Sequence, residues 1–276
     1  MSTSPSPQLP VAVPGARGAH TLRASQRYFG NGRASLGCAT ASEAVEAVCA
    51  GRASHAVIPV ENTITGIFDG VAEAFFSADV AVVGEITMPI RHALMSAPGV
   101  RLEDISVVTA HMASLSQCRD WLAGWGFATR PSQDTSASAR ELAKSGDEGL
   151  AVLGSRDLAQ ANGLQILAEG LSDRPDNQTR FLVVGRAGEL AESGSRVAVQ
   201  VGPINEPRTM KTLRMQLESL GASHVRVPLL GTEDGRRYLV EFDYEGGAGF
   251  EAAARACSAI PHRLLGSWAP GGRVAG

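Results

Sequence analysis

Short apolar strands that alternate with helix-like segments constrain the fold of this chain more than any other feature. The alternation is clearest between residues 105 and 167. The expected strands there are 105–109, 127–130, 150–153 and 165–167, and the expected helices are 114–123, 137–145 and 155–162. Such a pattern is typical of a parallel sheet covered by helices, in which ligands bind beyond the carboxyl ends of the strands.

The preceding part of the chain has a similar pattern. Strands are expected at 11–13, 56–60, 80–88 and 92–97, with helices at 21–29 and 42–50 and another after Gly66. Polar residues follow several of the expected strands in both parts: Asn62, the pair Ala110-His111, the pair Thr135-Ser136, and Ser155. Because these positions fall at the ends where ligands bind in such sheets, we expect them to meet in a single cleft.

The last part of the chain has a different order of elements. It reads as strand 196–202, helix 208–220, strands 224–230 and 237–244, helix 249–259 and strand 263–268. This βαββαβ order is typical of a ferredoxin-like unit. So small a unit leaves a sheet face or edge exposed, which favours pairing with a second copy of the chain.

Composition excludes several classes of function. The net charge is −3 and aromatic residues make up 5% of the chain, so no basic surface for nucleic acid is expected. The 4 cysteines are scattered without a C-x-x-C pair, which favours a reduced, cytoplasmic setting. No apolar run approaches the ~20 residues of a membrane span. Residues 1–9 resemble a disordered Ser/Pro tail rather than a signal peptide.

One polar segment leads directly into a strand. Residues 177–181, Asn-Gln-Thr-Arg-Phe, combine amides, a hydroxyl and a guanidinium, and an apolar run follows them. Polar groups at the entry to a strand are held by the sheet while they stay open to a ligand. On these residues alone, a segment that merely caps the strand is an equal alternative.

The motifs of the chain resemble those of the prephenate dehydratases, which carry a C-terminal ACT regulatory domain. The most specific motifs are Pro59-Val60-Glu61-Asn62-Thr63 with Gly66, and Thr179-Arg180-Phe181. Further matching segments occur in family order: the glycine turn 15–21, residues 83–85 with 89–90, residues 134–137 and residues 164–167.

The resemblance implies an α/β fold with a two-lobed domain, similar to a type II periplasmic binding protein, followed by a ferredoxin-like ACT domain. The boundaries we expect are a tail at 1–9, the dehydratase domain at 10–186 with its second lobe at about 93–168, a linker at 187–195, and the ACT domain at 196–270. The implied activity is conversion of prephenate to phenylpyruvate, water and carbon dioxide, without metal or organic cofactor. A homodimer or homotetramer and an amino-acid effector at the ACT domain are also implied.

The resemblance also assigns roles to individual residues. Thr179 is the natural proton donor to the leaving hydroxyl, and Asn62 lies in the pocket unless it merely closes a turn. Arg180 offers a forked guanidinium to a substrate carboxylate, unless it braces Glu61 or Glu85 instead. The other residues expected at the substrate are Thr63, Gly66, Arg17, Gly18, Gln117, Thr135, Ser136 and Phe181, with His111 and Glu61 as weaker candidates. Thr135 and Ser136 also fit an ordinary helix cap.

The chain departs from the family pattern in both domains. Where the family usually reads S-H-P-x, this chain has Ala110-His111-Met112-Ala113, so a serine hydroxyl is missing. In the ACT domain, residues 207–209 (Pro-Arg-Thr) replace a G-A-L segment, and residues 228–231 (Pro-Leu-Leu-Gly) replace E-S-R-P. Since those family segments bind phenylalanine, we expect feedback inhibition to be weak or absent.

Three other functions are compatible with the sequence. Arogenate dehydratase differs only in carrying an amine on the substrate where prephenate has a ketone. A prephenate decarboxylase-like enzyme would keep the hydroxyl, but such relatives lack both the E-N-x-x-x-G and the T-R-F features that are present here. A non-catalytic small-molecule sensor on the same cleft is the third, and the intact Asn62 and Thr179 argue against it.

Overall fold

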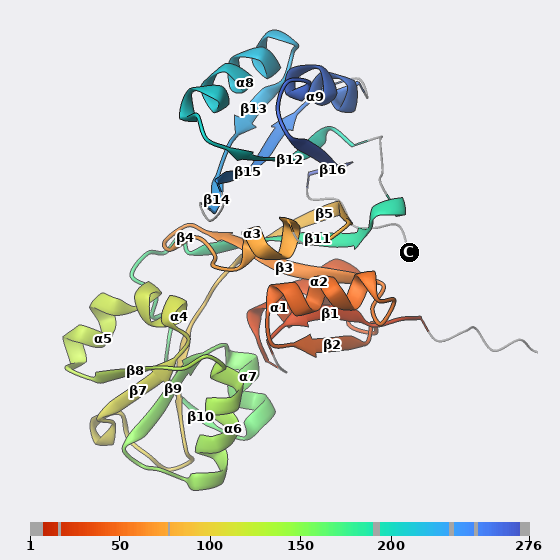
Figure 1. Cartoon of the computed structure of the whole chain (residues 1–276). Coiled ribbons are helices and arrows are strands. Elements are labelled where there is room, and N and C mark those ends of the chain that lie inside the picture. Colours follow the sequence, from red (N-terminus) through yellow and green to blue (C-terminus); the bar gives the residue numbers. More distant parts are fainter. Residues whose placement is uncertain are drawn as a thin grey trace, which may run out of the picture.

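The structure, a computed structural model, consists of two α/β lobes and a C-terminal antiparallel domain (Figure 1). It describes residues 8–15, 18–76, 78–189, 194–231, 235–245 and 248–270. Arg17, which we expected at the substrate, lies outside the described residues. So do residues 1–7 of the expected tail and 190–193 of the expected linker.

The first lobe contains a sheet with the strand order β2-β1-β3-β11-β5. Its strands are β1 (Val11–Pro14), β2 (Ser35–Cys38), β3 (His55–Asn62), β5 (Val80–Pro89) and β11 (Gln178–Arg186), and the short β4 (Gly66–Ile67) pairs with β3. Strand β1 is parallel to its neighbours, whereas β11 is antiparallel to both β3 and β5. The sheet is therefore mixed rather than parallel, because β11 enters it from the second lobe in the opposite direction.

Helices cover both faces of this sheet. They are α1 (His20–Phe29), α2 (Ala41–Cys49) and α3 (Val71–Phe76). Along β11, Phe181 and Val183 belong to the core cluster under α1, while Leu182 and Val184 belong to the cluster under α2 and α3. This division follows from the alternation of side chains along a strand. Helix α2 begins one residue earlier than the sequence suggested, because Thr40 caps it by accepting a hydrogen bond from the Glu43 N–H.

The second lobe has the strand order β10-β6-β9-β7-β8. Its strands are β6 (Ala93–Ser96), β7 (Val107–Ala110), β8 (Ala128–Pro131), β9 (Leu150–Gly154) and β10 (Gln165–Glu169), with helices α4 (Met112–Gln117), α5 (Arg119–Trp125), α6 (Thr135–Ser145) and α7 (Arg156–Asn162). The helix expected at 114–123 is broken in two at Cys118. The Ser155 cap of α7 is confirmed, since its hydroxyl accepts from the Leu158 N–H.

The C-terminal domain has the strand order β13-β15-β12-β16. Its elements are β12 (Arg196–Ile204), α8 (Pro207–Ser219), β13 (Ser223–Arg226), β14 (Leu229–Gly231), β15 (Arg236–Asp243), α9 (Gly249–Cys257) and β16 (His262–Trp268). The expected βαββαβ order is confirmed, although the strand expected at 224–230 is split into β13 and β14. Short 3-10 turns, Leu102–Asp104 and Ala187–Glu189, complete the elements.

The helix-free face of the C-terminal sheet packs against the first lobe (Figure 1). Ala198, Leu239 and Leu265 share one buried cluster with Val82 and Leu182 of the first lobe. The face that the sequence left exposed is thus covered within the same chain, because its apolar residues match an apolar face of the first lobe. Among the described residues, no helix is long and apolar enough to cross a membrane.

Candidate active site at the junction of the lobes

Thr179 and Asn62 are paired residues on neighbouring strands, at the start of β11 and the end of β3. Both are buried, with 3% and 2% of their surface exposed. The Asn62 side-chain nitrogen Nδ2 lies 3.0 Å from the Thr179 hydroxyl oxygen Oγ1, 2.9 Å from the Gln178 carbonyl oxygen and 2.8 Å from the Asn177 Oδ1. The two residues expected to be most important for catalysis are therefore in direct contact.

The turn after β3 fixes the orientation of the Asn62 amide. Its oxygen Oδ1 accepts hydrogen bonds from the backbone N–H groups of Ile64 (2.9 Å) and Thr65 (3.1 Å). The nitrogen must therefore face Thr179 as a donor. Within the described part of the chain, the Thr179 hydroxyl accepts this one bond and donates none, so its proton is available to a ligand. Asn62 both closes a turn and orients Thr179.

Thr63 fastens the same turn to the segment before β11. Its hydroxyl donates to the Asp176 carbonyl oxygen (3.0 Å) and accepts from the Gln178 N–H (3.0 Å). Thr63 therefore holds the backbone around Thr179 rather than presenting its hydroxyl to a ligand in this structure.

A chain of buried amides extends from Asn62 into the second lobe. The Asn177 Nδ2 donates to the Gln117 Oε1 (3.0 Å) and to the Ser172 Oγ (2.9 Å). The Gln117 Oε1 also lies 2.6 Å from the His92 Nε2. Gln117 belongs to α4 of the second lobe and Asn62 to β3 of the first, so the network joins the two lobes at the point where the chain crosses between them.

Two histidines that the sequence did not identify lie at the far end of this network. The rings of His20 and His92 meet edge to face, with centroids 5.4 Å apart. Burial, then the neighbouring His92 and Arg23, lower the pKa of His20 to about 3, and burial lowers the pKa of His92. Both rings are therefore neutral near pH 7. His20 belongs to the glycine turn 15–21 and His92 to an expected strand, and neither pattern indicates that the two rings meet.

Arg180 faces away from Thr179 in this structure. Its Nε donates to Glu85 (2.7 Å), and its Nη1 and Nη2 donate to Glu241 of the C-terminal domain (2.8 and 2.5 Å). Burial alone would lower the pKa of Arg180, but the carboxylates of Glu241 and Glu85 raise it above its usual value. Successive strand residues point to opposite faces, so Arg180 braces Glu85 instead of binding a substrate carboxylate beside Thr179.

Glu61 and Phe181 also have structural partners. Glu61 forms an ion pair with Arg226 of the C-terminal domain. Phe181 is 1% exposed and packs in the core under α1. Neither side chain faces a ligand in this arrangement, and the contact of Phe181 with substrate stays a prediction.

Gly18 lies where the two lobes touch. Its carbonyl oxygen accepts a hydrogen bond from the Ser155 hydroxyl (2.5 Å), and a Cβ at Gly18 would stand 2.7 Å from the Leu158 Cα. Its φ of +91° also favours glycine. Gly66 has a φ of +78° and open space around it, beside the turn of Asn62.

The remaining predicted residues meet at the ends of β7 and β8. The Thr135 hydroxyl accepts from the His111 N–H (2.9 Å), and the His111 Nδ1 accepts from the Ala113 N–H (3.2 Å), which makes His111 the cap of α4. Ser136 is buried, and its N–H donates to Asp134 (2.8 Å), the residue that caps α6. Asp134 caps α6 and His111 caps α4, so Thr135 and Ser136 are the first residues of α6 and not its cap, which corrects that expectation.

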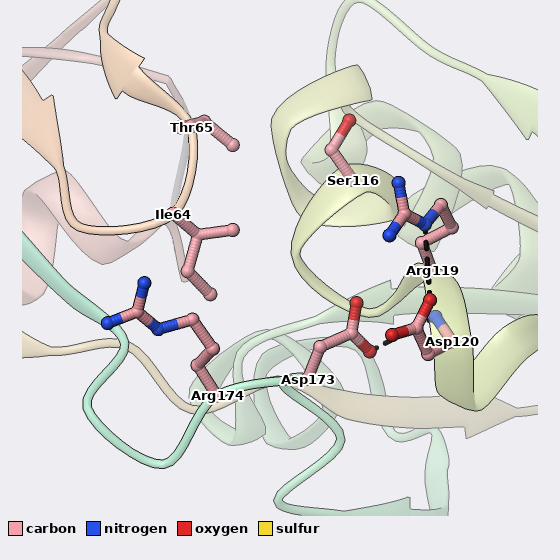
Figure 2. Close-up of a pocket in the computed structure, with 7 residues that line it drawn as sticks. All are labelled: Ile64, Thr65, Ser116, Arg119, Asp120, Asp173 and Arg174. Carbon is pink, nitrogen blue, oxygen red and sulfur yellow. Dashed lines mark hydrogen bonds and ion pairs between the residues drawn. The ribbon is translucent and has the colours of Figure 1, made fainter.

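A cavity of about 560 Å³ opens between the lobes next to the turn of Asn62 (Figure 2). It is lined by Ile64, Thr65, Ser116, Arg119, Asp120, Asp173 and Arg174. Arg119 bonds Asp120 (3.2 Å) and Arg174 bonds Asp176 (2.9 and 2.6 Å), yet both arginine side chains remain more than half exposed. Thr179 does not line this cavity, but Asn62 bonds the backbone of two residues that do. The sequence did not single out either arginine, since exposed charges on a helix or loop form no pattern.

One family model and several known proteins match this chain. The family model described as prephenate dehydratase matches residues 11–189. A bifunctional chorismate mutase/prephenate dehydratase of Stutzerimonas stutzeri is 30% identical over 235 residues, which cover 85% of this chain and 64% of that protein. The arogenate dehydratase/prephenate dehydratase 2 of Arabidopsis thaliana is 31% identical over 67% of this chain and 48% of its own length. The chain thus spans less than two thirds of either relative.

Solved structures agree with the fold. A prephenate dehydratase from Arthrobacter aurescens, described as a complex with L-Phe, has a TM-score of 0.79 and 27% identity, and the match covers 95% of this chain and 90% of that one. A protein described as a novel type of quorum quenching acylase has a TM-score of 0.78 at 23% identity, over 94% of this chain and 97% of that one, a likeness that shows the fold alone.

Proposed function

Because the chain belongs to the prephenate dehydratase family, we propose that it converts prephenate to phenylpyruvate, with Thr179 as the proton donor. The observation that carries this proposal is the buried contact between the Asn62 Nδ2 and the Thr179 Oγ1. It makes the hydroxyl an acceptor toward Asn62 and leaves its proton for the substrate.

The chemistry needs few protein groups. The bond between the ring and its carboxylate breaks, and its electron pair makes the ring aromatic as the ring hydroxyl leaves. Thr179 gives its proton to the departing oxygen, which leaves as water, and the net reaction takes up one proton from solvent. A hydroxyl is a weak acid in water, so the effect depends on placement and on stabilising the leaving oxygen in a dry site.

The substrate's carboxylates need a cationic partner other than Arg180. We assign this role to Arg119 and Arg174, which reach the cavity from opposite sides (Figure 2). A forked guanidinium matches a carboxylate in shape and charge. Gln117, Thr135 and Ser136 on the second lobe, and Asn62, Thr63, Gly66, Gly18 and Arg17 on the first, stay our candidates for neutral or turn contacts, with His111 as a weaker one.

Arogenate is the second candidate substrate. The Arabidopsis relative is described with both activities, and an arogenate dehydratase 1 of Petunia hybrida is 33% identical over 66% of this chain. The two substrates differ at the side chain, a ketone against an amine, and the amine carries a positive charge. Asp120 and Asp173 in the cavity would favour it, whereas the two arginines favour the dianion.

Regulation and assembly are part of the same proposal. The dehydratase domain covers 10–186 and the ACT domain 196–270, joined by the linker 187–195 and preceded by the tail 1–9. The Arthrobacter relative is described with L-Phe bound, but this chain has no acidic or hydroxyl side chain among residues 228–231. We therefore propose weak or absent control by phenylalanine, and pairing of two or four copies of the chain.

A product assay tests the activity directly. The purified protein is incubated separately with prephenate and with arogenate, and phenylpyruvate, phenylalanine and non-aromatic decarboxylated products are followed. Phenylpyruvate from prephenate supports the proposal, and phenylalanine from arogenate supports the second candidate. A non-aromatic decarboxylated product would indicate the decarboxylase reaction, and no product from either substrate would indicate a sensor.

A further inference from the structure

Two successive residue pairs on β3 and β11 face opposite sides of the sheet. Asn62 pairs with Thr179, and one residue along, Glu61 pairs with Arg180. The first pair forms the proposed site. The second pair points at the C-terminal domain, where Glu61 bonds Arg226 of β13 and Arg180 bonds Glu241 of β15.

We propose that the C-terminal domain supplies positioning residues, Glu241 and Arg226, that hold Asn62 and Thr179 in register through Arg180 and Glu61. The inference rests on the proposed role of Thr179 for its link to catalysis. It goes beyond that role, because it gives the C-terminal domain a part in building the site even when no effector is bound.

Arg180 and its two carboxylate partners are largely buried, so their ion pairs can hold β11 in position. Arg180 is 11% exposed, Glu241 2% and Glu85 8%. Charge-assisted bonds between buried groups are short and directional, and removing one partner leaves an unpaired buried charge. A displacement of the Arg180 side chain would therefore also displace the backbone of β11, which carries Thr179 as the preceding residue.

The ion pairs continue across the interface. The Glu85 Oε1 accepts from the Arg196 Nη1 (2.7 Å), and Arg196 bonds Asp243 through its Nε (2.8 Å) and Nη2 (3.0 Å). The side-chain hydrogen bond to Asp243 raises the pKa of Arg196. Acidic and basic groups thus alternate from Glu241 through Arg180, Glu85 and Arg196 to Asp243, and this network of ion pairs joins the two domains.

A small displacement of Thr179 relative to Asn62 is expected to lower the reaction rate. The Asn62 Nδ2 holds Thr179 at 3.0 Å, and a misplacement of about 1 Å in a catalytic group can cost about 10²-fold in rate. Each ion pair to the C-terminal domain sits one residue from this contact. A rotation of the C-terminal domain would pull on Glu61 of β3 and Arg180 of β11, and so change the distance between Asn62 and Thr179 on the same two strands.

The first test replaces Glu241 by Gln in the full chain. We expect kcat to fall by about 10-fold with KM within about 2-fold, because Thr179 is displaced while the cavity is kept. The matched control is Glu218→Gln, which breaks the exposed Arg214–Glu218 pair on α8 of the same domain. The control should leave kcat and KM unchanged. Equal kinetics for E241Q and wild type would overturn the proposal.

The second test uses the more exposed pair, where charge changes are compatible with folding. Glu61 and Arg226 are 34% and 40% exposed. Arg226→Glu and Glu61→Arg each place like charges together and should lower kcat, and the double variant should recover most of the loss. Recovery in the double variant assigns the loss to the Glu61–Arg226 pair rather than to either side chain alone. Failure of the double variant to recover kcat would count against the proposal.

A readout without substrate separates this inference from the proposed activity. Amide hydrogen exchange is measured for peptides covering residues 61–65 and 176–181 in wild type, E241Q and E218Q. Faster exchange of both peptides in E241Q alone supports the positioning role, even if the wild type does not convert prephenate. Unchanged exchange in E241Q would overturn the role, whatever the enzyme's substrate is.

Discussion

The Asn62 side-chain amide lies 3.0 Å from the Thr179 hydroxyl, and a turn that begins at Asn62 itself sets its orientation. The donor that positions Thr179 is therefore fixed by backbone N–H groups two and three residues further along the chain. Such a hydroxyl needs no rearrangement before it meets a substrate, which is the condition for efficient stabilisation of a leaving oxygen.

Replacing Thr179 tests the proton donor. Thr179→Ala should lower kcat by about 10²-fold or more, the range in which positioned acid groups contribute. Thr179→Ser keeps the hydroxyl and should retain most of the rate. Steady-state kinetics with prephenate, together with circular dichroism to verify the fold, provide the measurement. An Ala variant as fast as wild type would remove Thr179 from this role.

Replacing Asn62 tests the orientation of that donor. Asn62→Ala leaves the N–H groups of Ile64 and Thr65 without their acceptor, so we expect unfolding to cost about 1–3 kcal/mol less, together with a fall in kcat. Thr63→Ala removes bonds from the same turn without touching the Thr179 hydroxyl. Urea melts and kinetics of both variants should show similar losses of stability but a smaller fall in kcat for T63A. Equal falls in kcat would assign the effect to the turn alone.

Gly18 tests the contact between the lobes. Gly18→Ala and Gly30→Ala both place a side chain at a positive φ, +91° and +94°, that favours glycine. Only the Gly18 variant meets a neighbour, with its Cβ 2.7 Å from the Leu158 Cα, whereas nothing lies within 4 Å of a Cβ at Gly30. Thermal melts should therefore show a larger loss for G18A, and its KM should rise as the lobes separate. If the two variants melt alike, the contact does not hold the lobes together.

The lowered pKa values of His20 and His92 predict how stability depends on pH. The pKa of His20 is lowered to about 3 in the folded chain, from about 6.5 when exposed. His20 therefore binds a proton in the unfolded state but not in the folded state, and stability falls as pH drops below about 6.5, by about 1.4 kcal/mol per pH unit for His20. The lowered pKa of His92 acts in the same direction. His20→Phe keeps an aromatic ring without this titration. Urea melts between pH 7 and pH 4 should show a shallower slope for H20F, and an identical slope would contradict the prediction.

Phenylalanine binding tests the altered ACT segments. Residues 207–209 and 228–231 differ from the family pattern, so isothermal titration should show no saturable binding of L-Phe in the micromolar range. Prephenate turnover should likewise be insensitive to added L-Phe. Tight, saturable binding would contradict the prediction and would show that other residues take over the contacts.

The sequence by itself determined most of the order of the elements, the βαββαβ end of the chain and the two segments that meet at the site, but it did not indicate strands β2 and β4. Asn62 and Thr179 could be identified because each lies in a short motif at the end of a strand. Strand alternation also carried a signal that Arg180 and Thr179 face opposite sides. A motif places three residues side by side in the sequence, however, and this suggested a shared role.

Only the tertiary structure decided which residues contact each face of strand β11. The destination of Arg180 depends on Glu241, which is 61 residues away, and the contact of Glu61 depends on Arg226, 165 residues away. The placement of His20 beside His92, and of Gln117 beside Asn177, likewise depends on how the lobes close. Local pattern sets the period of a strand or helix, but the partner of a side chain is set by long-range packing, which no local pattern contains.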